Sequence, residues 1–237
     1  MKYYIPLIAT SAALLLPLSA HSYCFQPQPR LVCGEYFDSK LIIEATLVQI
    51  DSVGDPDSPD AYNYTLQVDR ILVGKSDTTI HVYEGNDSGR ASFYWVKGRK
   101  YLLFLRYHDD FKAWVLDGCG NSGPLRKAGK ALAQIAAIQT AHDGGWIRGE
   151  FSDRSEGVRI VAEGSAGVFS TESGKQGIFK IKVPAGQYNL RAADPDGVFK
   201  YIKADFSYED PENIHIVPGS CAQVEFTQVD AKSPQKK

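Results

Sequence analysis

Turn-forming glycines divide the C-terminal part of the chain into short segments that alternate as β-strands do. Apolar side chains recur at every second position between the turns, as expected when one face of a strand is buried. Gly and Pro-Ala-Gly reverse the chain between the segments, and residues 194–197 (Asp-Pro-Asp-Gly) predict another hairpin turn. The segments are residues 145–149, 157–160, 177–180, 186–190 and a closing strand at 222–229. The inward-facing set is Phe179, Ile181, Val183, Tyr188 and Leu190. The pattern predicts a small β-sandwich over residues 145–229.

A second β-rich block precedes this sandwich. Its five segments are β-branched, aromatic or alternating in the manner of strands. They are residues 41–50, 62–68, 79–83, 100–107 and 113–116. Apolar residues then recur at three and four positions from Leu125 to Ile138, which predicts a helix packed against the strands through Leu125, Ala128, Leu132 and Ile135. Ser122 is the predicted N-cap, with Pro124 in the first turn, and Gly144-Gly145 ends the helical block.

The N-terminal residues predict export. Lys2 precedes an apolar run to Leu18 that Pro6 and Pro17 interrupt, and small residues follow it. This is typical of a signal peptide over residues 1–22, cleaved after Ser22 or alternatively Ala20, rather than of a membrane span. The mature protein is therefore expected to be secreted or periplasmic, with no transmembrane segment. Its four cysteines would then form disulfides, since exported proteins fold in an oxidising compartment.

Composition and residue spacing exclude several functions. The net charge is −2, and the only basic run is the tail at residues 230–237, which we expect to be disordered, so nucleic-acid binding is not indicated. The cysteines form no Cys-x-x-Cys pair and the histidines are scattered, so neither a metal site nor a cofactor is predicted. Residues 120–124 (Gly-Asn-Ser-Gly-Pro) resemble a serine-protease nucleophile loop but lack an upstream histidine motif, and no catalytic residue is assigned.

The first block resembles the tissue inhibitor of metalloproteinases, or netrin-like, module. The resemblance rests on Cys24, the segments 37–45, 68–74 and 98–105, and Cys119 followed by Leu125. It implies a five-stranded barrel of the oligonucleotide/oligosaccharide-binding (OB) type with a C-terminal helix, over residues 23–144. It also implies protease inhibition through an N-terminal cysteine that chelates zinc. Here the predicted cleavage leaves Tyr23 in front of Cys24, which would convert the chelating amine into an amide.

The second block resembles the carboxypeptidase regulatory-like, transthyretin-like sandwich. The resemblance rests on Gly149, Gly157-Val158, residues 177–179 and residues 184–190. This family is generally an accessory to enzymes, receptors and surface proteins and brings no active site of its own. The expected fold is therefore all-β, with a barrel followed by an immunoglobulin- or transthyretin-like sandwich at residues 145–229.

The netrin-like resemblance also implies the disulfide pattern. In that family the closing strand is tied to the N-terminal segment, which pairs Cys119 with Cys24 or Cys33; Cys24 is the preferred partner. The remaining cysteine would then reach Cys221 and join the two blocks. Both pairings are kept as alternatives.

The only aromatic cluster suited to a ligand is Phe93-Tyr94-Trp95, since OB-type barrels bind sugars or single strands by stacking. We expect a non-enzymatic protein that binds an unknown protein or glycan in the cell envelope or outside the cell. A metalloproteinase inhibitor and a carbohydrate- or peptide-binding module are the alternatives.

Overall fold

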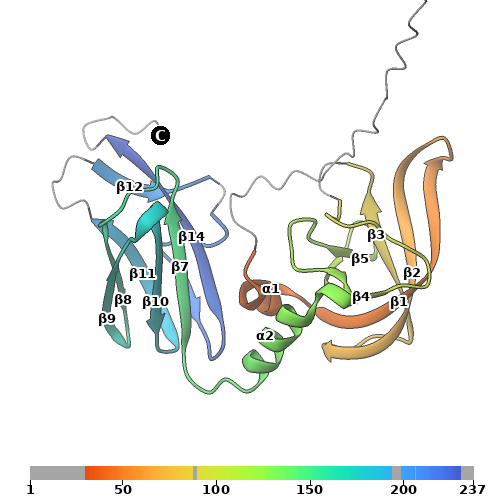
Figure 1. Cartoon of the computed structure of the whole chain (residues 1–237), viewed down its shortest axis with the longest axis horizontal. Helices are drawn as coiled ribbons and strands as arrows, with labels where there is room; N and C mark the ends of the chain where they lie inside the picture. The colour runs from red at the N-terminus through yellow and green to blue at the C-terminus, as the bar shows by residue number, and fades with distance from the viewer. Residues whose placement is uncertain (1–29, 88–89, 194–198, 206, 231–237) are drawn as a thin grey trace, which may run out of the picture.

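The computed structural model describes residues 30–87, 90–193, 199–205 and 207–230 (Figure 1). Most of them lie in β-strands and two short α-helices, which confirms the all-β class. The predicted signal peptide, Cys24, the turn at 194–197 and the tail after residue 230 lie outside the described residues.

Residues 41–124 form one sheet that closes on itself, because its first strand also pairs with a later one. The strands are β1 (Leu41–Asp55), β2 (Ser58–Val73), β3 (Thr79–Gly85), β4 (Lys100–His108), β5 (Ala113–Leu116) and β6 (Gly123–Pro124). They pair in the order β1-β2-β3-β5-β4-β6, and β1 also pairs with β4. We call this part, with its two helices, the first β unit. The five predicted strands are all present, but β1 and β2 extend into residues 51–61, which lie between two of the predicted segments.

Two clusters of buried side chains hold the first β unit together. Residues that alternate on β1 to β4, such as Leu47, Leu66 and Leu103, fill the inside. The opposite faces of β1 and β4 are also buried, because Ile42, Leu102 and Phe104 pack under the helices. Burial on both faces explains why these strands read as continuous apolar runs rather than as alternating ones.

The helices that cover this outer face are α1 (Val32–Asp38) and α2 (Gly129–Gln139). The predicted stripe is confirmed, since Ala128 and Ile135 are buried and Leu125 and Leu132 pack beside them. The predicted N-cap is wrong: residues 125–127 form a 3-10 turn, and Ala128 is the N-cap of α2. Ser122 instead accepts the backbone N–H of Phe104 at 2.9 Å, because β6 places it beside β4.

Residues 145–230 form the second β unit from two four-stranded sheets (Figure 1). One sheet has the order β10-β7-β14-β12, and the other β13-β11-β8-β9. The strands are β7 (Gly145–Phe151), β8 (Arg159–Gly164), β9 (Gly167–Glu172), β10 (Ile178–Val183), β11 (Gly186–Ala193), β12 (Phe199–Lys203), β13 (Ile214–Ile216) and β14 (Cys221–Asp230).

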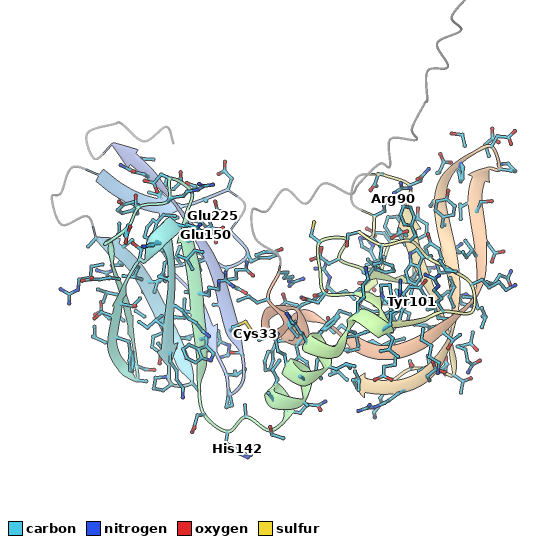
Figure 2. All side chains as sticks on the ribbon, in the orientation of Figure 1. Cys33, Arg90, Tyr101, His142, Glu150 and Glu225 are labelled. Atoms are coloured by element: carbon cyan, nitrogen blue, oxygen red, sulfur yellow. A yellow bond between two sulfur atoms is a disulfide. The ribbon has the colours of Figure 1, made fainter. Side chains whose placement is uncertain are left out.

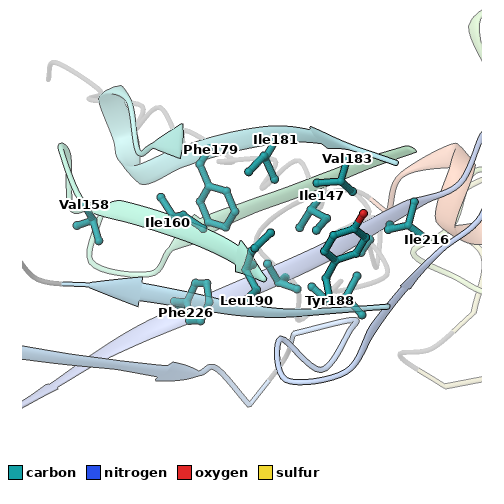
Figure 3. Close-up of a cluster of buried hydrophobic side chains, with 14 of the residues drawn as sticks. Ile147, Val158, Ile160, Phe179, Ile181, Val183, Tyr188, Leu190, Ile216 and Phe226 are labelled. Carbon is teal, nitrogen blue, oxygen red and sulfur yellow. The ribbon is translucent and has the colours of Figure 1, made fainter. Parts of the chain in front are cut away.

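The core of the second β unit contains the predicted inward-facing residues (Figure 3). Phe179, Ile181, Val183, Tyr188 and Leu190 are all buried. Gly149 is required at the centre of β7 because a Cβ there would overlap the Phe179 ring and lie 2.7 Å from Val224. Glycine therefore serves close packing here, in addition to turns.

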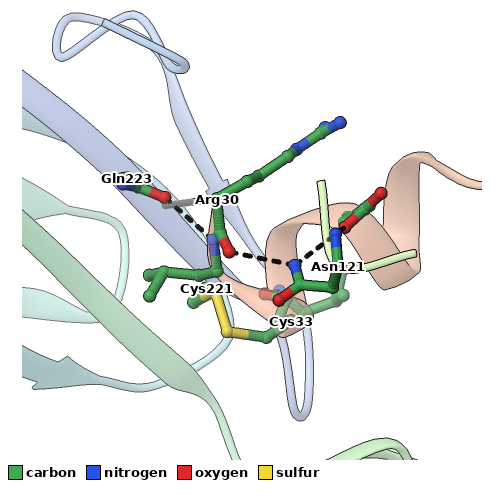
Figure 4. Close-up of a disulfide and its surroundings, with 9 residues drawn as sticks. Arg30, Cys33, Asn121, Cys221 and Gln223 are labelled. Atoms are coloured by element: carbon green, nitrogen blue, oxygen red, sulfur yellow. Dashed lines mark hydrogen bonds between the residues drawn. A yellow bond between two sulfur atoms is a disulfide. The ribbon is translucent and has the colours of Figure 1, made fainter. Parts of the chain in front are cut away.

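The two β units meet through the segment that precedes the first strand. Cys33 in α1 forms a disulfide with Cys221 at the start of β14 (Figure 4). Next to it, the Leu31 N–H donates to the Gln223 side chain at 3.0 Å. Cys119 is disulfide-bonded as well, so the Cys33–Cys119 alternative is wrong. The pairing of Cys119 with Cys24 stays a prediction, because Cys24 lies outside the described residues.

A polar network surrounds this junction. The Arg30 guanidinium is paired with Asp38 and with Asp117, and it lies 5.4 Å from the Tyr208 ring of the second β unit. Glu35 is buried and accepts both the backbone and side-chain N–H of Asn121, and no residue that the structure describes donates to its Oε1. Burial raises the pKa of Glu35, and the Asn121 hydrogen bonds oppose that effect.

We expect Glu35→Gln to change how stability depends on pH. A carboxyl whose pKa is raised by folding binds its proton more tightly in the folded state, so its ionisation lowers stability as pH rises from 4.5 through the folded pKa. Urea unfolding from pH 4 to 8 should show that decline in the wild-type protein and a smaller one in Glu35→Gln. The control is Glu209→Gln, which removes another carboxyl whose pKa is raised by burial and so shows how much of the decline that group causes. Identical pH profiles for wild type and Glu35→Gln would contradict this assignment.

Candidate functional site

The Phe93-Tyr94-Trp95 cluster lies in the connection between β3 and β4. Its three side chains do not all face the same way. Phe93 and Trp95 pack against the core of the first β unit, and the Trp95 ring stacks on Tyr64 with centroids 4.4 Å apart. Tyr94 points outward and is 73% exposed. Of the three candidates, Tyr94 is therefore the one with a ring face available to a ligand.

Hydrogen bonds hold this connection in place. The buried Tyr101 hydroxyl accepts the Val96 N–H at 2.6 Å and donates to the Tyr94 carbonyl at 3.3 Å. At the end of the loop the Gly98 N–H donates to the Leu47 carbonyl at 2.7 Å, and Gly98 takes a positive φ of 80°. Because Tyr94 sits between these contacts, its ring is presented from a fixed backbone.

A hollow of about 630 Å³ adjoins Tyr94 between this loop and the start of α2. Phe93 and Tyr94 line one part of it. The residues that line the rest of it include no described carboxylate but four basic side chains, which are Arg99, Arg126, Lys127 and Lys130. We call these four residues and Tyr94 the basic hollow. A neighbouring depression of about 570 Å³ continues over Arg99, Lys100 and Arg126.

The helical region dictates where the basic side chains point. Leu125, Ala128 and Ile135 face the strands, which leaves the residues between them on the solvent side. Arg126, Lys127 and Lys130 are accordingly exposed beside Arg99, which follows the positive-φ turn at Gly98. The geometry thus assembles cations from two segments that are separated by β4, β5 and β6.

The charges of the basic hollow are not neutralised within the structure. None of its four basic side chains forms an ion pair with any residue that the structure describes. Three of them flank the N-terminus of α2, whose first turn holds no acidic residue and which has no side-chain cap. A helix N-terminus carries partial positive charge, so these cations do not stabilise the helix. An anion in the hollow would relieve their mutual repulsion.

A second pocket, of about 410 Å³, adjoins the same loop, and Ser92, Phe93 and Tyr94 line both this pocket and the first hollow. Its lining residues include Tyr62, Tyr64, Glu84, Trp95 and Arg90, the last of which is labelled in Figure 2. Its polar and aromatic groups are already committed: Tyr64 donates to Glu84 at 2.8 Å, Glu84 accepts the Ala91 N–H at 2.7 Å, and Tyr64 stacks with Trp95. Burial and the neighbouring Glu84 raise the pKa of Tyr64. This pocket serves mainly to fix the loop.

Sequence reasoning missed the basic residues of the hollow because it looked for a continuous run of charge. The available signals were the pair Arg99-Lys100 and the spacing of Arg126, Lys127 and Lys130 around a helix start. Neither signal shows that the two groups meet. Their approach depends on the pairing of β4 with β6, at Tyr101↔Pro124 and Leu102↔Gly123.

The structure brings no other predicted chemistry together. Within the described ranges, no three His, Cys, Asp or Glu side chains are grouped so that they could hold a metal ion. Cys24, on which zinc chelation by an inhibitor would depend, lies outside them, so that alternative stays a prediction. Ser122, in the protease-like segment, bonds to the backbone of Phe104.

Comparisons with known proteins add no assignment. A scan against protein-family models finds no match to this sequence, and a search of curated proteins finds none either. Within the part of the chain that the structure describes, no helix has the length and apolar character needed to cross a membrane.

Proposed function

We propose that this is an exported, non-enzymatic binding protein that takes an acidic carbohydrate in the basic hollow. The observation that carries the proposal is the hollow itself, where an exposed tyrosine and four basic side chains that form no ion pair with a described residue line a concave surface to which no described carboxylate contributes. Cations attract the carboxylate or sulfate groups of such a chain, and an aromatic ring offers its face to a sugar ring. The disulfides support an oxidising compartment, secreted or periplasmic.

The fold supports the same proposal. We propose that the first β unit is an OB-type, netrin-like barrel, since its strands pair in the ring β1-β2-β3-β5-β4-β1 with α2 following the last strand. We further propose that the second β unit is a carboxypeptidase regulatory-like sandwich, with a boundary at residues 144 and 145. OB-type barrels bind oligosaccharides and oligonucleotides on their surface, which fits a ligand held beside the β3–β4 loop.

Removing the charges of the hollow should weaken binding of an acidic oligosaccharide. We expect Arg99→Gln/Arg126→Gln/Lys127→Gln/Lys130→Gln to lose about tenfold or more in affinity, since each exposed charge contact contributes roughly 0.2–1 kcal/mol. Calorimetry with a heparin octasaccharide and an oligogalacturonate measures the loss. The control is Arg106→Gln/Arg159→Gln/Lys75→Gln/Lys200→Gln, which removes the same charge from exposed sites elsewhere.

The same titrations separate carbohydrate binding from simple attraction to polyanions. Tyr94→Ala should weaken binding of the oligosaccharides, whereas Tyr107→Ala, which truncates an exposed tyrosine on β4, should not. A single-stranded oligothymidylate of equal charge should bind more weakly than the oligosaccharides. Equal loss of affinity in both charge variants, or equal affinity for the oligothymidylate, would contradict the proposal.

A further inference from the structure

A second concavity lies between the two β units, and Gln134 of α2 lines both this concavity and the one that holds the basic hollow. It has a volume of about 800 Å³, within the range usual for ligand sites, which commonly lie between domains. The disulfide Cys33–Cys221 and the segment around Gly144 are part of its lining. In Figure 2, Cys33 and His142 mark the space between the two halves of the molecule. We call this concavity the junction groove.

The two walls of the junction groove differ in character. One wall is the end of α2 and the residues just after it, which contribute the apolar side chains of Ala137, Ile138 and Ala141. The other is the outer face of β7 and β10, which contributes Trp146, Arg148, Ile178, Lys180 and Lys182. Only one carboxylate, Asp143, lines the groove, and it is exposed near one end. A ligand that satisfies both walls needs an apolar side and an acidic side.

The spacing of the cations matches an extended peptide. Lys180 and Lys182 are two residues apart on one strand, so they face the same side at a separation of about 6.6 Å. An extended ligand repeats its side chains on each face at that same interval. Arg148 pairs in register with Lys180 and widens the row of positive charge. The Lys180 ammonium lies 3.7 Å from the Trp146 ring centroid, and Trp146 is 40% exposed.

We propose that the junction groove binds an extended, acidic segment of a partner protein in which apolar and acidic residues alternate. The acidic side chains face Lys180, Lys182 and Arg148, and the apolar ones face α2. A long-chain fatty acid fits the row of cations less well, because it carries its charge at one end only. Glu150 and Glu225 lie further along the same outer face and do not line the groove, which sets a limit to how far the acidic segment extends.

Binding is tested with designed peptides on the full exported protein. The probe is an acetylated, amidated peptide of four Asp-Leu repeats, and the matched control is a peptide with four Asp followed by four Leu. We expect the alternating peptide to bind and to change the fluorescence of Trp146, a change that Trp146→Phe abolishes. Equal binding of the two peptides, or no binding of the alternating one, overturns the proposal.

Variants locate the site. Lys180→Gln/Lys182→Gln should weaken binding of the alternating peptide about fivefold, whereas Lys75→Gln/Lys200→Gln, with the same charge change elsewhere, should leave it unchanged. The quadruple variant of the basic hollow should bind the peptide normally, which distinguishes this proposal from the acidic-carbohydrate one. Unchanged affinity in Lys180→Gln/Lys182→Gln would mean that these lysines only protect an edge strand. Tighter binding of laurate than of the alternating peptide would assign the groove to a fatty acid. Either result overturns the proposal.

Discussion

Replacing Cys33 and Cys221 together with serine should lower the free energy of unfolding by roughly 3 to 5 kcal/mol. The bond joins residues 188 positions apart, so it encloses the cores of both β units in one loop and restricts the unfolded chain strongly. Urea unfolding followed by tryptophan fluorescence measures the change, and we expect one transition to become two. Adding a reductant to the variant provides the control, since its further effect reports the bond at Cys119 alone. A loss below about 1 kcal/mol with a single transition would show that contacts other than the disulfide couple the units.

Limited proteolysis also tests the junction between the two β units, at the segment that follows α2. His142 and Asp143 are exposed, whereas Gly145 is buried and the Gly219 N–H donates to the Gly144 carbonyl at 3.0 Å. We therefore expect the first cut at His142 or Asp143. The two fragments should stay joined without reductant and separate with it. Survival of this segment while other loops are cut would contradict the proposed boundary.

Truncating Phe151 to alanine should destabilise the second β unit by about 3 to 5 kcal/mol, the usual cost of removing a buried aromatic ring. Phe151 is 2% exposed and packs on Phe179, Tyr201 and Phe226 with ring centroids 5.8, 4.7 and 5.5 Å away. In the Cys33→Ser/Cys221→Ser background, only one of the two unfolding transitions should shift.

Phe111→Ala is the matched control for this truncation. Phe111 is 52% exposed in the first β unit and stacks only at the surface, on Tyr83 and His108. Its loss should cost little and should leave the transition of the second β unit in place. A comparable loss of stability in the two variants would contradict the two separate cores.

The sequence predicts the fold best where local pattern and tertiary contact agree. Phe179, Tyr188 and Leu190 alternate inward as their spacing requires, because each packs on the opposite sheet at every second position. The start of α2 was predicted too early because Ser122 is a good N-cap residue by type. In the fold, Ser122 satisfies the backbone of β4 instead, a choice that depends on β6.

The candidate site was predicted only in part. The stretch 93–95 indicated a surface, but its alternation packs the partly buried Phe93 and Trp95 against the core and exposes Tyr94, which depends on where the loop crosses the core. The α1 helix was missed since it is one short segment of seven residues with no side-chain cap. The basic hollow could not be read from the chain because Arg99 and Lys130 meet only when β4 and α2 pack together.

Chemical-shift mapping tests the central claim most directly. Titrating the isotope-labelled, full exported protein with an oligogalacturonate should shift the amide signals of Tyr94, Arg99, Lys127 and Lys130 first and most. Signals from the second β unit should stay in place. Shifts that concentrate elsewhere, or none at all while the same oligosaccharide is seen to bind by calorimetry, would contradict an acidic-carbohydrate site in the basic hollow.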